Sequence, residues 1–156
     1  MLKLFNFNGG VKPDYHKAAS TGLPIGTVPL PAELVIPLHQ SIGGTPQPLV
    51  AVGEKVLKGQ RSGAADGNVS AAVHASTSGT IKAVEMRRMP HPSGLSALCV
   101  VIAPDGEERW IERMAFDYRN ATPDVLRDYL RDAGIVGLGG AVFPSHLKLT
   151  PGKAGR

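Results

Sequence analysis

Turn-forming residues interrupt this chain at short intervals. The 156 residues include 19 glycines and 13 prolines, while aromatic residues make up only 5%. Proline removes a backbone hydrogen-bond donor and glycine raises the entropic cost of ordering the chain, so both disfavour the interior of a long helix. This composition is typical of short strands connected by tight turns. We therefore predict a mostly β structure.

The overall composition suits one globular domain, or one domain with part of another, since 42% of the residues are hydrophobic and 19% are charged. The net charge of +4 is scattered along the sequence, which is a weak indication of nucleic-acid binding. The single cysteine, Cys99, lies in the apolar run ALCVVIA, and we predict that it is buried and forms no disulfide within the chain. No stretch approaches the roughly 20 apolar residues that cross a bilayer, and the N-terminus lacks the apolar core of a signal peptide.

Strand patterns fill the middle of the sequence. Residues 1–27 are predicted to form an extended lead-in, and the prolines that follow, such as Pro37, suit short edge strands. The segments PLVAVGEKVLKGQ and ASTSGTIKAVE combine apolar residues with turn residues, as short strands do. In ALCVVIAPDGEERWIE we predict a hairpin, in which residues 104–106 separate an apolar strand from a strand carrying Trp110. Together these patterns predict a small β-sandwich or barrel.

The pattern changes to helical near residue 120. Thr122 is a suitable N-cap, Pro123 fits the first helical position, and Gly134 supplies a stop. Between them, apolar residues recur at helical spacing on one face. We place a boundary near residue 120, where this helix opens a second, α/β unit.

A glycine-rich loop follows the helix, in the segment GIVGLGGAVFPSHLKL. Gly137, Gly139 and Gly140 would let backbone N–H groups approach an anion without a Cβ in the way. We expect a short helix after Pro144, with its positive end and the Lys148 ammonium directed at the same place. The alternative is a tight turn that needs glycine for positive φ angles. Phosphate binding and a purely structural turn are both compatible with these residues.

Other chemistry is poorly represented. The five histidines show no metal-ligand spacing, and no arrangement typical of a hydrolase nucleophile is present. Glu107, Glu108 and Glu112 follow a turn, so we interpret them as solvated charges on an exposed strand. We therefore predict neither a catalytic side chain nor a metal site.

Six segments resemble one known family in order and spacing. They are FNGGVKPDYHK, LPAELVIPLHQSIG, PLVAVGEKVLKGQ, VHASTSGTI, HPSGL and AGIVGLGGAVFPSHLKL. Over about residues 7–149 the chain resembles the N-terminal portion of the RnfC family, the C subunit of the Rnf (or Rsx) electron transport complex, a bacterial membrane-associated, NADH-linked oxidoreductase. The resemblance implies an extended lead-in over residues 1–28 and a barrel-sandwich hybrid domain, similar to biotinyl and lipoyl carriers, over residues 29–119. Residues 120–156 would form the start of the α/β FMN- and NADH-binding domain shared with the flavoprotein of respiratory complex I.

The resemblance also implies cofactors and roles. Hydride from NADH would pass to FMN, and electrons would then leave singly through 4Fe-4S clusters. Partners would be the other subunits of the complex, with no nucleic acid and no membrane span, and the location would be peripheral, on the cytoplasmic side of the bacterial inner membrane. Carried over by position, the glycines would contact the flavin through their backbone, Phe143 would lie near the nucleotide, and Lys148 would contact the cofactor. The implied cofactor-binding residues are Gly137, Gly139, Gly140, Phe143 and Lys148.

The chain departs from the family in three respects. The family usually reads Gly-Gly-Ala-Gly-Phe-Pro-Thr in the loop, whereas this chain has Val142 for the last glycine and Ser145 for the threonine. Valine is a poor substitute if that position needs a positive φ, so we expect weaker FMN binding than with glycine there. The chain also ends at Arg156, before the acidic nucleotide segment and the cysteine-rich cluster motifs. We therefore expect a fragment that is inactive alone, with its least stable part after residue 120.

An alternative function uses only the barrel. Carriers of this fold hold a lysine at a hairpin tip, but the corresponding residues 64–72, AADGNVSAA, contain none. A swinging-arm carrier is therefore not expected. The body would instead act as a non-catalytic scaffold or docking module.

Overall fold

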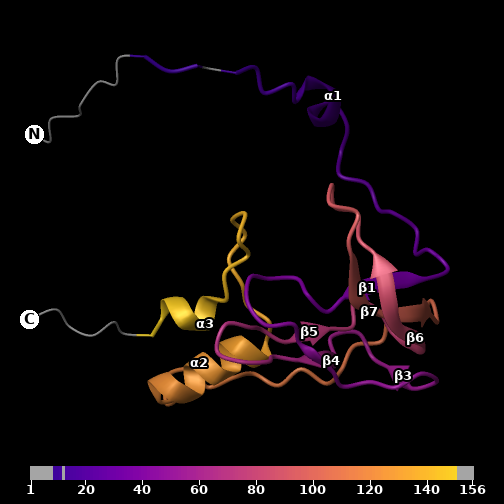
Figure 1. Ribbon diagram of the computed structural model, residues 1–156, viewed down its shortest axis with the longest axis vertical. Helices are drawn as coiled ribbons and strands as arrows, with labels where there is room; N and C mark the ends of the chain where they lie inside the picture. The colour runs from indigo at the N-terminus through magenta and orange to yellow at the C-terminus, as the bar shows by residue number, and fades with distance from the viewer. Residues whose placement is uncertain (1–8, 12, 151–156) are drawn as a thin grey trace, which may run out of the picture.

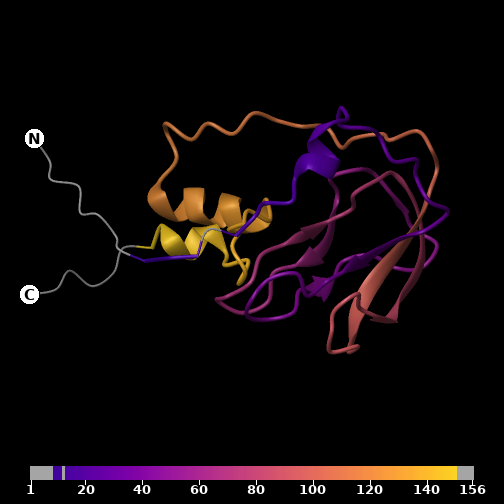
Figure 2. The same ribbon diagram turned by 90° about the horizontal axis from the view of Figure 1, so that it is seen from above.

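Two antiparallel sheets form the body of the protein (Figures 1 and 2). The computed structural model describes residues 9–11 and 13–150. One sheet has the strand order β1-β7-β6-β3 and the other β2-β4-β5. The prediction of a mostly β structure is confirmed. The strands are β1 (Leu34–Pro37), β2 (Gln47–Pro48), β3 (Lys55–Val56), β4 (Arg61–Ala64), β5 (Val73–His74), β6 (Gly79–Arg88) and β7 (Ser96–Pro104), and the helices are α1 (Ala18–Thr21), α2 (Pro123–Asp132) and α3 (Ser145–Lys148).

The long hairpin of β6 and β7 builds most of the core. Nine of the ten residues of β6 pair with the nine of β7, and the irregularity between Ile81 and Ala83 leaves Lys82 out of the register. Val100 and Ile102 of β7 join the main apolar cluster, where β1 contributes Ile36. A fully buried aliphatic side chain of this size contributes about 1.5–3 kcal/mol to folding. Cys99 is fully buried, as its apolar surroundings predicted.

Edge positions accommodate the prolines. β1 is the outer strand of the larger sheet and pairs with β7 through Leu34 and Ile102 at one end and Pro37 and Cys99 at the other. A proline costs little there, because an edge strand leaves alternate backbone groups unpaired. The predicted edge-strand role of Pro37 is confirmed. Before β1, the described part of the lead-in is exposed chain with one helical turn, α1.

The predicted hairpin after β7 is wrong. A turn does follow Pro104, but the next segment does not return along β7. Instead Trp110 forms a parallel bridge with Lys58: the Lys58 backbone N–H donates to the Arg109 carbonyl (2.8 Å), and the Ile111 N–H donates to the Lys58 carbonyl (3.0 Å). The turn chemistry was local and visible in the sequence, whereas the pairing partner lies about fifty residues away.

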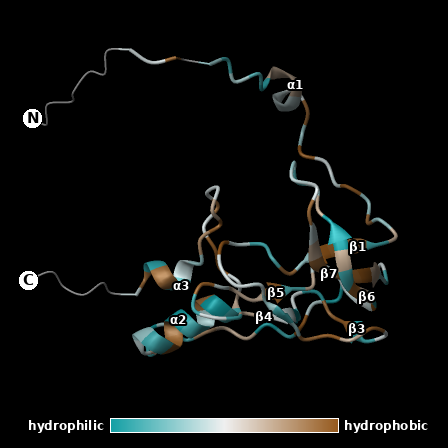
Figure 3. Ribbon diagram, in the orientation of Figure 1, coloured by the Kyte–Doolittle hydropathy of each residue, from teal (hydrophilic) through white to brown (hydrophobic). Residues whose placement is uncertain are grey.

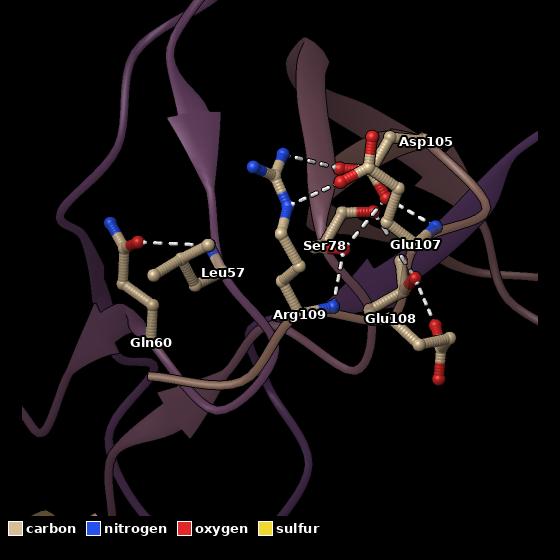
Figure 4. A network of polar contacts seen from close by, with 8 residues as sticks. Leu57, Gln60, Ser78, Asp105, Glu107, Glu108 and Arg109 are labelled. Atoms are coloured by element: carbon tan, nitrogen blue, oxygen red, sulfur yellow. Dashed lines mark hydrogen bonds and ion pairs between the residues drawn. The ribbon is translucent and has the colours of Figure 1, made fainter. Parts of the chain in front are cut away.

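A polar network holds this segment in place (Figure 4). The Asp105 carboxylate accepts hydrogen bonds from Ser78 Oγ (2.7 Å), the Glu107 backbone N–H (2.9 Å) and the Arg109 guanidinium (3.0 Å). These bonds, with that of Ser78 the largest effect, lower the pKa of Asp105 to about 2. Glu108, which we interpreted as a solvated charge, instead pairs with Lys58 and accepts a hydrogen bond from Thr77 Oγ1.

The helical segment after residue 120 forms as predicted. Thr122 caps α2 by accepting a hydrogen bond from the Val125 N–H (3.4 Å), Pro123 is its first residue, and Gly134 follows with φ +69°. None of the ten residues of α2, all of them described, is buried. Figure 3 shows the contrast between the apolar residues of β6 and β7 and the many polar positions of α2.

Candidate functional site in the glycine loop

The glycine loop is a narrow finger between α2 and α3 (Figure 1). Val136 and Pro144 form an antiparallel bridge at its base. The Gly137 N–H donates to the Phe143 carbonyl (2.8 Å), and the Ser145 N–H donates to the Ile135 carbonyl (3.0 Å). These contacts close the two sides of the finger on each other. The loop is therefore an ordered turn with a short paired stem.

The tip of the finger is open to solvent. Leu138 is 99% exposed, and a Cβ added at Gly139 or Gly140 would meet no atom within 4 Å. Within the described chain, the backbone N–H groups of Gly139 and Gly140 donate no hydrogen bond. A loop tip with undonated amides and no side chain in the way can accept an anionic or flat ligand.

Lys148 brings a positive charge to the stem of the finger. A Cβ at Gly137 would lie 2.6 Å from Lys148 Nζ, so the ammonium occupies the space that a larger residue at position 137 would fill. Among residues 9–11 and 13–150, Lys148 has no carboxylate partner within ion-pair distance. The structure therefore places Gly137 and Lys148 together, with Gly139 and Gly140 at the exposed tip.

The short helix after Pro144 is present, as predicted, but it supplies little charge. α3 has a single turn, Ser145–Lys148, and Pro144 at its N-cap makes no side-chain hydrogen bond. A macrodipole needs several aligned turns to act as a half charge. The positive potential at this loop thus comes from the Lys148 side chain. The N-terminal end of α3, which was expected to contribute, adds little.

The positive φ angles of this segment are not at the three candidate glycines. Gly134 (φ +69°) and Val142 (φ +46°) adopt them, whereas Gly137, Gly139 and Gly140 do not. A Cβ at Gly134 would also lie 2.6 Å from the Ala72 carbonyl oxygen, so this position requires glycine on both counts. Position 142 has the positive φ for which valine was considered a poor substitute, and valine there is strained.

Several contacts attach the loop and its helices to the barrel, among them the Arg61–Asp132 ion pair and the three hydrogen bonds that follow. The Ala72 N–H donates to the Arg131 carbonyl at the end of α2 (3.0 Å), and the Ile42 N–H donates to the Ala141 carbonyl near the loop tip (3.2 Å). His146 of α3 is buried, and its Nε2 lies 3.2 Å from the Asn68 carbonyl oxygen. Since a carbonyl can only accept, Nε2 is the donor.

Sequence reasoning did not identify His146 as an anchor. It lies two residues from Lys148, but its partner Asn68 is far away in the sequence, in the loop between β4 and β5. Ser145, His146 and Lys148 of α3 are all polar, so the sequence shows His146 only as one polar residue of a mostly polar turn. Such a residue is compatible with many roles, so the contact had to be observed.

The described residues hold no group of three or more histidine, cysteine, aspartate or glutamate side chains that could bind a metal ion. Over the same part of the chain, no helix has the length and apolar character needed to cross a membrane.

Comparison with known proteins identifies similar sequences. The model of the RnfC barrel sandwich hybrid domain family matches residues 5–107. Proteins named as the C subunit of an ion-translocating oxidoreductase complex are similar over almost the whole chain. The relative from Serratia proteamaculans is 46% identical over 154 residues, and that from Pseudomonas aeruginosa is 48% identical over 150 residues.

These relatives are much longer than the chain. The match covers 98% of this chain and 22% of the Serratia protein, and 96% of this chain and 19% of the Pseudomonas protein. A relative from Vibrio cholerae is 45% identical over 151 residues, covering 96% of this chain and 20% of its own length. The chain thus spans about a fifth of the length of the relatives that it matches.

Proposed function

The chain belongs to the RnfC barrel sandwich hybrid domain family, and from this premise we propose that it is the part of an electron transport protein in which a barrel supports a flavin-binding loop. The barrel-sandwich fold and the likeness to RnfC that the sequence motifs predicted are confirmed. The α/β flavin domain after residue 120 stays a prediction, as do the domain boundaries at residues 28 and 119.

The cofactor that we propose for the glycine loop is FMN. One observation carries this proposal: the Lys148 ammonium, which has no ion-pair partner among the described residues, lies beside the Gly137 backbone, at the stem of a loop whose tip amides donate no hydrogen bond there. An anionic cofactor would find a positive charge and free donors there. These residues therefore fit a phosphate-bearing flavin.

Each residue has a specific task in this proposal. Lys148 would neutralise negative charge on the cofactor, and Gly139 and Gly140 would donate backbone hydrogen bonds. Phe143, at the rim of the finger, would contact the nucleotide through its ring. When bound, FMN takes up hydride from NADH and passes electrons on one at a time. The task of the protein would be to fix the position of the cofactor.

The remaining parts of the function lie outside this chain segment. We propose that NADH binds next to the loop, that 4Fe-4S clusters elsewhere in the full-length protein accept the electrons, and that other members of the complex are the partners. The place that we propose is peripheral, at the cytoplasmic side of the bacterial inner membrane; the relatives are named as parts of an ion-translocating complex, which supports a place at a membrane.

Flavin titration tests the proposal directly. FMN added to the full chain should shift its absorbance saturably, and Lys148→Ala should weaken binding by about tenfold, the effect of losing one charge-assisted hydrogen bond. Lys82→Ala is the matched control, because Lys82 pairs with Glu33 on the barrel and lies outside the loop. Equal affinities for the two variants would contradict the assigned role of Lys148.

The second candidate function is a non-catalytic scaffold or docking module. The observation in its favour is that all residues of the main apolar cluster belong to the barrel, from Ile36 to Ile102 in the sequence. The barrel therefore has a core that does not depend on the glycine loop. The absence of any flavin binding in the wild-type chain and in Val142→Gly would favour this function over the first.

A further inference from the structure

A cleft in the described part of the chain lies away from the glycine loop. It has a volume of about 710 Å³ and lies where the barrel meets α2 and the segment that follows β7. Its walls come from the β3–β4 turn, the end of β5, residues 110–113 and the C-terminal half of α2, and no residue of the finger contributes. Clefts of about 300–1,000 Å³ are the usual size for small-molecule ligands.

Two aromatic side chains give this cleft flat apolar surfaces. Both Trp110 and Tyr129 line the cleft. Trp110 is 49% exposed and Tyr129 is 43% exposed, so part of each ring is accessible to a ligand. Phe116 stacks on Tyr129, with ring centroids 3.9 Å apart and planes 9° apart, and so holds the tyrosine ring in one orientation. Gly59 lets the indole approach closely, because a Cβ there would lie 3.0 Å from the Trp110 ring. A planar ring is the ligand group that suits such walls.

Three cations surround the aromatic surfaces, and two of them are compensated. Lys58 pairs with Glu108, and Arg61 pairs with Asp132 at 2.8 Å. Arg113 lies over the Trp110 ring, 4.6 Å from its centroid. It forms no ion pair or hydrogen bond with any residue in the described ranges. The cleft therefore carries one uncompensated positive charge.

The histidine of the cleft, His74, adds no charge. Burial is the main cause that lowers the pKa of His74, so its ring is neutral at neutral pH. A neutral imidazole can still donate or accept a hydrogen bond. The electrostatics of the cleft are thus set by Arg113, against a background of paired charges.

We propose that this cleft binds a planar aromatic anion, with the ring against Trp110 and Tyr129 and the anionic group at Arg113. The anionic group is a phosphate or a carboxylate, as in a nucleoside monophosphate or an aromatic acid. A guanidinium suits both groups, because its fork of donors matches two acceptor oxygens. The cleft contains no residue of the glycine loop and is therefore a second site, separate from the one proposed for FMN.

The single tryptophan of the sequence makes the test specific, since Trp110 is the only indole in the chain. The full chain is titrated with AMP and, separately, with benzoate, with adenosine and inorganic phosphate as controls. We expect a saturable change in Trp110 fluorescence, confirmed by calorimetry, with AMP or benzoate. The probe that binds more tightly identifies the phosphate or the carboxylate source. A failure of both probes, or equal affinity for adenosine or phosphate, would overturn the proposal.

Three variants locate the bound probe. Arg113→Ala should weaken binding by about tenfold, as expected for the loss of one charge-assisted contact. Arg119→Ala is the matched control, because Arg119 lies over the exposed Tyr118 ring and does not line the cleft. Calorimetric affinities are compared, since Arg113→Ala also changes the surroundings of Trp110.

Lys148→Ala separates the cleft from the glycine loop and should leave the affinity for AMP and benzoate unchanged. Unchanged binding in Arg113→Ala, or a loss in Arg119→Ala or Lys148→Ala as large as that in Arg113→Ala, would overturn the proposal.

Discussion

At the scale of single residues, Val142 has a backbone conformation that β-branched residues avoid. Its φ of +46° costs a residue with a Cβ about 1–2 kcal/mol. Replacing it by alanine or by glycine removes the same apolar contacts, but only glycine relieves the strain. We expect Val142→Gly to be more stable than Val142→Ala by about 1 kcal/mol in urea unfolding.

The neighbouring Ala141 supplies the control for this comparison. Its φ is not positive, so Ala141→Gly should only increase the entropy of the unfolded chain and lower stability. If Val142→Ala proved the more stable of the two variants at position 142, the positive φ would be contradicted. The same Val142→Gly variant is expected to bind FMN more tightly than the wild type, as the sequence comparison at that position predicts.

Asp105 makes stability depend on pH in the acid range. Its pKa in the folded protein is lowered to about 2, below its value in the unfolded chain, so the stabilisation is complete at higher pH and is lost as pH falls toward 2. In Asp105→Asn, the decrease of the melting temperature between about pH 4 and pH 2 should be smaller than in the wild type.

Ser78→Ala tests the cause of this shift. Ser78 Oγ donates the hydrogen bond that lowers the pKa of Asp105 most. The variant should raise the pKa of Asp105 toward its ordinary value, as measured by NMR titration of the carboxyl carbon. An unchanged pKa would show that the other donors, Glu107 N–H and Arg109, are sufficient.

At the scale of elements, α2 differs from the strands in how it is held. It has no buried residue, while β7 carries four consecutive buried ones, Cys99 to Ile102. Elements with few buried contacts open locally before the whole molecule unfolds. We expect amide hydrogens of α2 to exchange with solvent faster than those of β6 and β7.

Thr122→Ala should make this difference larger. Loss of the cap costs about 1 kcal/mol, and that cost should appear in the exchange of α2 amides, with the strands unaffected. Asp128→Ala is a control, since Asp128 is an exposed residue of the same helix that makes no cap hydrogen bond. Equal protection of α2 and β7 in the wild type would contradict the prediction.

The elements also show what the sequence can and cannot predict. α2 is predictable from its N-cap to its stop, because Thr122, Pro123 and Gly134 act within a few residues of where they stand. The strand after residue 106 was assigned the wrong partner, because Trp110 pairs with Lys58 across a long stretch of chain. No local pattern encodes such a contact.

The candidate site likewise has features that the sequence predicts and features that depend on distant parts of the chain. Gly137 and Lys148 lie together because the finger and the short α3 connect them within eleven residues, so their chemistry could be inferred from spacing. The attachment of His146 to Asn68 depends on how the barrel folds, as does the 710 Å³ cleft around Trp110. These features required the structure.

At the scale of the whole molecule, the connection between β7 and α2 is an accessible internal link. Residues 112–120 are mostly exposed and include Arg113 and Arg119. Brief digestion with trypsin should cut after these arginines before it cuts after Lys82 or Arg87, which lie within β6. Mass spectrometry of the early fragments checks this. Equally early cuts within β6 would show that the barrel is not the more stable part.

The contacts that join the finger and its helices to the barrel, three hydrogen bonds among them, determine more than proximity. A body attached at one point can still rotate in every direction, and a body attached at two points can rotate about the line between them. α2, α3 and the finger do not lie along one line (Figure 1), and each has its own hydrogen bond to the barrel. Attachment at separate points restrains rotation of the finger on the barrel, so the barrel sets both its position and its orientation, and with them the angle at which any bound ring would be presented to a redox partner.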